Sequence, residues 1–144
     1  MKIKAKLATI LLLCLTSLQT AAADPGTSTT EWKNLPQEGL LAGEGGIGAG
    51  SFTIREVWGG ENAPLTGSAS MTDDKSCAVR VTNRSALRVQ LNLEVRQFNA
   101  ERKIISKNPF LARLDPYKTN ERTVKTRNGA IGCGLFVTGW KSLD

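Results

Sequence analysis

The residues that could perform chemistry in this chain do not include a histidine. Histidine is the commonest general base and a common metal ligand, so Ser-His-Asp, Cys-His and histidine-zinc mechanisms are excluded. The adjacent acidic pair Asp73-Asp74 could in principle act as paired carboxylates or bind calcium. Neighbouring side chains on an extended backbone point in opposite directions, which makes a solvated turn the simpler interpretation. We therefore predict a protein that is not an enzyme, with no catalytic residues, no metal and no cofactor.

Cysteine is the other residue type with chemistry of its own, and the sequence has three. Cys14 lies in an N-terminal apolar run, and Leu13 precedes it where a lipoprotein site prefers a small residue. Cys77 and Cys133 lie 56 positions apart, each on the inward phase of a strand-like segment. The chain has neither Cys-x-x-Cys spacing nor a histidine to complete a metal site, so the pair is predicted to form a structural disulfide.

Residues 1–23 predict the compartment that such a disulfide needs. Three lysines precede an apolar run at residues 7–15, and Ala21-Ala22-Ala23 supplies the small residues of a signal-peptidase site. The apolar run is shorter than the roughly 20 residues that a membrane-spanning helix needs. We therefore expect a cleaved signal peptide, a mature chain that begins at Asp24, no membrane span, and a periplasmic or secreted location.

The Gly-rich string at residues 43–48 (GEGGIG) formally fits the fingerprint of a dinucleotide-binding turn. That fingerprint needs a buried parallel strand before it and a helix after it, whereas polar residues precede this string and the β-forming residues 52–54 follow. We interpret it as a mobile or closely packed backbone that leads into a strand at residues 51–58. The polar, aperiodic residues 24–39 are predicted to be a flexible arm, from which Trp32 could dock on the body.

Residues 40–144 are expected to form a single domain built of strands. Apolar and polar residues alternate with a period of two, and turn residues separate the alternating segments. Seven or so short strands without a helical stripe predict an all-β, antiparallel immunoglobulin-like sandwich with one disulfide, and a small closed barrel is the alternative. The last two segments should form a closing pair across Asn128-Gly129. Besides 51–58, the expected strands are 77–82, 87–95, 103–106, 123–126 and 132–140.

Residues 77–126 resemble the small bacterial sandwiches of the FxLYD type, which occur on exported proteins. In that family an alternating strand ends in an aromatic-Asp turn and a Gly-Lys step. The matching residues here are 98–103 (FNAERK), with Arg102 in the place of the glycine. A later Leu-x-Pro-Gly loop is matched by residues 114–117 (LDPY), with Tyr117 in the place of the glycine. The resemblance implies a fold and no activity, since such sandwiches mostly act as interaction or assembly modules.

Charge is unevenly distributed, with a net −6 over residues 24–74 and +9 over residues 75–144. Arg80, Arg88 and Arg96 lie on the outward phase of successive strands and would share one face if those strands share a sheet. Such a basic face could bind an acidic protein, an anionic glycan or a lipid, whereas the scarcity of aromatic residues disfavours nucleic acid. The alternative is a solvated sheet whose charges keep its edges from pairing.

These observations predict an exported, non-enzymatic interaction module of the bacterial envelope. It would bind another envelope or extracellular protein through its basic face or its edge strands, for example as an assembly factor or chaperone. The alternative is a binder of anionic envelope glycans or lipids, or an inhibitor of an enzyme that acts on them.

Overall fold

The computed structural model describes residues 28–47, 50–55, 57–72 and 75–144. The predicted signal peptide and the pair Asp73-Asp74 lie outside these residues. The described residues contain one short 3-10 helix, η1 (Trp32–Asn34), and no α-helix. The strands are β1 (Gly39–Ile47), β2 (Gly50–Arg55), β3 (Leu65–Met71), β4 (Ser76–Asn83), β5 (Val89–Phe98), β6 (Ile104–Leu114), β7 (Thr119–Lys125) and β8 (Gly132–Ser142).

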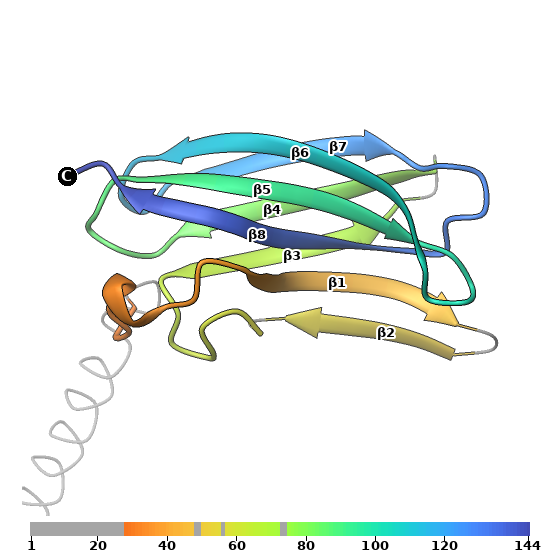
Figure 1. The fold of residues 1–144 in the computed structure, drawn as a ribbon, viewed down its shortest axis with the longest axis horizontal. Helices are drawn as coiled ribbons and strands as arrows, with labels where there is room; N and C mark the ends of the chain where they lie inside the picture. Colours follow the sequence, from red (N-terminus) through yellow and green to blue (C-terminus); the bar gives the residue numbers. More distant parts are fainter. Residues whose placement is uncertain (1–27, 48–49, 56, 73–74) are drawn as a thin grey trace, which may run out of the picture.

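The strands form two antiparallel sheets, packed as the two layers visible in Figure 1. One sheet has the order β2-β1-β8-β5-β6 and the other the order β3-β4-β7. This arrangement confirms the predicted antiparallel sandwich, with eight strands rather than about seven. The expected pairing across Asn128-Gly129 is wrong, because β7 pairs with β4 while β8 pairs with β1 and β5. That turn carries the chain from one sheet to the other.

The core lies between the sheets and follows the alternation of the sequence. Val79 and Val81 point inward from β4, opposite the inward residues of β5 and β8. Each of these inward side chains is 4% exposed or less. Burying each large apolar side chain contributes about 1.5–3 kcal/mol of transfer free energy. The inward residues of β5 and β8 include Leu91, Leu93, Val95, Leu135 and Val137.

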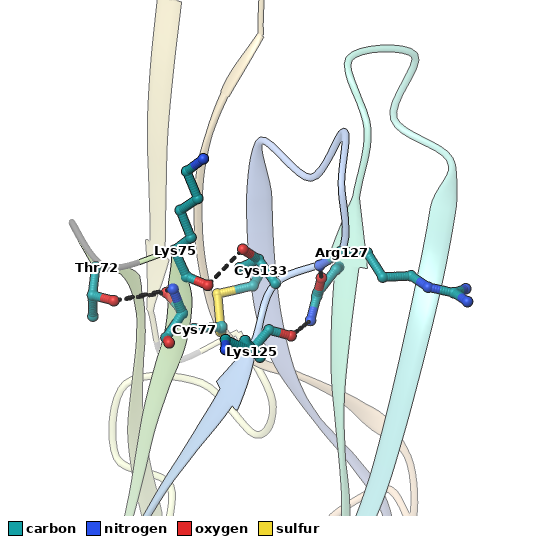
Figure 2. Close-up of a disulfide and its surroundings, with 9 residues drawn as sticks. Thr72, Lys75, Cys77, Lys125, Arg127 and Cys133 are labelled. Atoms are coloured by element: carbon teal, nitrogen blue, oxygen red, sulfur yellow. Dashed lines mark hydrogen bonds between the residues drawn. A yellow bond between two sulfur atoms is a disulfide. The ribbon is translucent and has the colours of Figure 1, made fainter.

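The disulfide between Cys77 of β4 and Cys133 of β8 joins the two sheets, as predicted, with 6.3 Å between the Cα atoms. Figure 2 shows it beside the segment that crosses between the sheets after β7. Buried Gln97 holds this segment: its Nε2 donates to the carbonyl of Lys125 at 3.0 Å, and its Oε1 accepts from the backbone N–H of Arg127 at 2.7 Å. A covalent bond therefore fixes the start of β8, and a satisfied buried amide fixes the segment that leads to it.

The described part of the predicted arm packs on the sandwich through Trp32, whose docking is confirmed. Its side chain is 6% exposed, and its ring centroid lies 5.9 Å from that of Trp58 and 5.0 Å from that of Trp140. The carbonyl of Pro36 accepts hydrogen bonds from the indole N–H groups of Trp58 and Trp140, each at 3.0 Å. All three tryptophans of the chain thus close the end of the sandwich at which β8 finishes (Figure 1).

Three tight turns place a residue with a side chain where glycine is favoured. Lys75, Arg102 and Tyr117 have φ angles of 62°, 64° and 62°, in the left-handed region. For a residue with a Cβ this conformation costs roughly 1–2 kcal/mol of conformational free energy. Arg102 and Tyr117 are the two positions at which the chain departs from the glycines of the FxLYD pattern.

Candidate functional site

The outer face of the five-stranded sheet carries a groove of about 550 Å³ above β1 and β8. Because Cys133 and Leu135 of β8 point into the core, their neighbours Gly132 and Gly134 lie on the outer face. In the ladder between β1 and β8, Gly43 stands opposite Gly134, and a fourth glycine, at position 45, stands opposite Gly132. These four facing positions carry no side chain, and three of them, Gly43, Gly132 and Gly134, form the floor of the groove.

Apolar side chains from four strands and one loop form the walls. Each of them is partly exposed, so the face is apolar without being covered by another element of the described chain. The rings of Phe98 and Phe136 meet at a centroid distance of 6.3 Å and an interplanar angle of 57°. The wall residues are Leu40, Phe52, Ile54, Phe98, Ile131 and Phe136.

The four facing glycines differ in what a Cβ would meet. A Cβ on Gly45 would lie 2.7 Å from the Cα of Gly132, and a Cβ on Gly132 would lie 2.9 Å from the Cα of Gly45. These two glycines allow the close approach of β1 and β8. A Cβ on Gly43 would meet no atom closer than 3.5 Å, so this position would accept a Cβ in ordinary contact with its neighbours. The closely packed interpretation of the Gly-rich string is confirmed for β1, which is itself a strand rather than a loop before one.

Arg102 is the only charged residue among the described residues that line the groove. It belongs to the β5–β6 turn, in which Asn99 Oδ1 accepts the backbone N–H groups of Glu101 at 3.0 Å and Lys103 at 2.9 Å. The guanidinium of Arg102 forms no hydrogen bond or ion pair with another described residue. Nearby, the guanidinium carbon of Arg96 lies 4.0 Å from the ring centroid of Phe136 and adds a cation-π contact.

The three arginines of the predicted basic face are not brought together. Arg80 points outward from β4 in the three-stranded sheet, whereas Arg96 points outward from β5 in the five-stranded sheet and Arg88 directly precedes β5. The assumption of a shared sheet was therefore wrong, because the chain changes sheets between β4 and β5. Each of the three forms an ion pair within the protein, Arg80 with Glu121, Arg88 with Asp144 and Arg96 with Glu94. This arrangement matches a solvated surface with interspersed charge.

The contact between Arg88 and Asp144 lowers the pKa of the Asp144 carboxyl. The backbone N–H of Arg88 donates to Asp144 at 2.9 Å, and its guanidinium Nε donates at 3.2 Å. The backbone hydrogen bond is the main reason that the pKa of Asp144 is lowered, and the guanidinium contributes further. The contact ties Asp144, two residues after β8, to the residue before β5.

The edge strand β6 is protected against strand addition. Pro109 lies in its middle, and the register shifts between Gln97 and Phe98 leave a bulge at Ile105. The guanidinium of Arg127 donates to the carbonyl of Ile105 at 3.0 Å, which occupies one acceptor of the edge. These features make the edge of β6 a poor template for an added strand.

Other site types find no support in the described ranges of the chain. No group of three or more cysteine, aspartate or glutamate side chains there is placed to hold a metal ion. In the same ranges no helix has the length and apolar character to cross a membrane. No protein-family model, no curated protein and no solved structure matches the chain.

The groove was missed by reasoning from the sequence, although a signal for it exists. On β8 both phases are apolar, with Cys133 and Leu135 inward and Gly134 and Phe136 outward. On β2, Phe52 and Ile54 stand opposite glycines of β1. Apolar residues on the outer phase of several strands mark a sheet face that is not simply solvated, but their convergence required the strand order.

Proposed function

We propose that this protein is an exported, non-enzymatic interaction module of the bacterial envelope that binds another envelope or extracellular protein. The apolar groove on the outer face of the five-stranded sheet is the binding site. The observation that carries this proposal is the combination of partly exposed wall residues, three of them phenylalanine, with a glycine floor that leaves room for inserted side chains. Contiguous apolar surface of this kind marks interaction sites on proteins. A role as an assembly factor or chaperone fits it.

A protein partner fits this groove better than a lipid or a glycan. The groove lies on an open sheet face, so it covers an inserted group from one side. A folded partner brings its own apolar surface to cover the other side, whereas a lipid chain bound alone would remain in contact with water. A glycan would need several converging polar side chains, and Asn99 and Arg102 are the polar ones among the described lining residues.

Export is supported by the signal-like residues 1–23 and by the disulfide, since disulfides persist in oxidising compartments. The non-enzymatic part of the proposal is supported by the chain's lack of histidine. It is further supported by the composition of the groove, where Arg102 is the only titratable side chain among the described lining residues.

Site-specific photo-crosslinking in cells tests the proposal. A benzophenone amino acid at position 54 lies in the groove wall, and the same residue at exposed position 119 of β7 is the control on the opposite sheet. We expect one discrete protein adduct from position 54 and none from position 119. Gly43→Val fills the floor without a steric conflict at Cβ and should abolish that adduct. An adduct that survives this substitution, or that forms equally from position 119, would place the interaction elsewhere.

A further inference from the structure

We infer that the partner segment which fills the groove carries a carboxylate beside its apolar anchor, and that Arg102 binds this carboxylate. The inference rests on the proposed function and names the chemistry of the partner. Arg102 belongs to the β5–β6 turn and lines the groove together with the wall residues Phe98 and Ile131. An apolar anchor between these walls would bring the group beside it within reach of a guanidinium.

The charge of Arg102 is available to a ligand. The guanidinium is exposed, has no ion pair with a described residue, and shares the groove lining with no acidic residue of the described chain. Arg96, the other arginine on this face, is already paired with Glu94 and stacked on Phe136. A carboxylate that binds Arg102 would therefore not compete with an acidic group among the described residues that line the groove.

The backbone of Arg102 adds a second reason. At φ 64° a glycine would be more stable than any residue with a Cβ. No side-chain hydrogen bond or ion pair with a described residue compensates for keeping arginine at this position. Tyr117 has φ 62° in the turn before β7, at the other end of β6, and lies outside the groove. It provides a matched position at which the backbone is the same and the groove is absent.

Substitution by glycine should therefore separate folding from binding. Arg102→Gly is expected to raise the thermal midpoint by about 3 °C and to weaken binding of an acidic apolar ligand about fivefold, the size of an exposed ion pair. Tyr117→Gly should raise the midpoint by a similar amount and leave binding unchanged. Opposite effects on stability and binding at Arg102 would not follow from a merely structural role.

Two fluorescent probes with the same ring system test the charge preference directly. Anilinonaphthalene sulfonate carries an anionic group, and N-phenyl-1-naphthylamine lacks it. The native protein should bind the sulfonate about fivefold more tightly, and this preference should fall with added salt. Arg102→Gly should remove the preference while retaining the neutral dye, and Gly43→Val should weaken both dyes. A preference that is absent from the native protein, or that survives Arg102→Gly, would overturn the inference.

Selection from a displayed library of random peptides tests the occupant. The native protein should enrich peptides with aspartate or glutamate within about two residues of a large apolar anchor, and Arg102→Gly should lose this acidic bias. Enriched apolar peptides without an acidic bias would overturn the role of Arg102 and leave the proposed function standing. Failure to enrich any peptide that depends on Gly43, while the dyes still bind, would overturn the protein partner itself and favour a small amphiphile.

Discussion

Adding one methyl group at Gly43 or at Gly45 should have opposite effects on stability. In Gly45→Ala the new Cβ would lie 2.7 Å from the Cα of Gly132, 3.0 Å from Phe52 Cε1 and 3.1 Å from the carbonyl oxygen of Ile131. Two of these neighbours are backbone atoms, so β1 and β8 must move apart. In Gly43→Ala the nearest atom, the carbonyl oxygen of Cys133, would be 3.5 Å away, which is an ordinary contact.

The magnitudes follow from two opposing terms. Replacing glycine by alanine within a strand stabilises by roughly 0.5–1 kcal/mol, because alanine loses less conformational freedom on folding. Overpacking a well-packed site costs roughly 1–3 kcal/mol. Gly45→Ala should therefore lower the unfolding free energy by about 1–2 kcal/mol, whereas Gly43→Ala should raise it by up to about 1 kcal/mol. For a domain of this size, 1 kcal/mol corresponds to about 4 °C in the thermal midpoint.

Urea and thermal unfolding monitored by far-ultraviolet circular dichroism measure both variants, with mass spectrometry to confirm that the disulfide is intact in each. The double variant Gly45→Ala with Gly132→Ala refines the test. Once the strands have moved apart to admit one methyl group, a second methyl group should destabilise the protein less. The loss of unfolding free energy in the double variant should therefore be smaller than the sum of the losses in the two single variants. Equal stability of Gly43→Ala and Gly45→Ala, or the reverse order, would refute the close approach of β1 and β8.

Three further predictions concern the disulfide, the tryptophan cluster and the last residue. Removing the disulfide with Cys77→Ala and Cys133→Ala should lower the unfolding free energy by about 4 kcal/mol, because the bridge closes a loop with a sequence separation of 56. A loss below about 1 kcal/mol in urea unfolding would contradict the structural staple. Trp32→Ala should cost about 3–5 kcal/mol, because its ring is 6% exposed and packs on two other tryptophans. Unchanged thermal unfolding and tryptophan fluorescence would mean that the segment before β1 does not dock. The pKa of Asp144 is lowered in the folded protein, chiefly by the backbone N–H of Arg88, so its contact stabilises above the unfolded pKa and is lost as the pH falls through the lowered value. A carboxyl NMR titration should show the lowered pKa, and Arg88→Gln should retain much of the shift because the backbone N–H remains; titration at the ordinary value of 3.8 would refute the contact.

Strands with alternating apolar and polar residues could be predicted from the sequence, because each of them faces the core on one side and solvent on the other. Val79 and Val81 identify β4, and Leu91 and Leu93 identify β5, before any pairing is known. The disulfide partners could be predicted because the signal-like start left two cysteines, both on inward phases. By contrast, β3 has one Gly and mostly small residues with only its ends strongly apolar, so nothing in its pattern distinguished it from a loop.

The sequence did not show which sheet each strand joins. The outer face on which each outward residue lies could therefore not be predicted either. Alternation fixes the side of a strand, but strands joined by a short turn can belong to one sheet or to two. Asn83, at the β4–β5 corner, is buried and donates to the carbonyls of Leu87 and Asp115 at 2.7 Å and 3.2 Å. This buried amide satisfies the backbone where the chain leaves one sheet for the other. Arg80 and Arg96 were placed on one face because this crossing was not recognised.

The position of the disulfide relative to the groove has an energetic reason. Gly43, where a Cβ would meet no atom closer than 3.5 Å, weakens the ladder between β1 and β8 by roughly 0.5–1 kcal/mol relative to alanine. The disulfide contributes about 4 kcal/mol by the chain-entropy estimate, and Cys133 stands between Gly132 and Gly134 on the neighbouring strand β8. The covalent bond on the inner face therefore offsets this loss on the outer face of the same sheet. A floor without side chains can in this way remain well ordered, which is what a groove needs if it is to accept a partner's side chains without first rearranging.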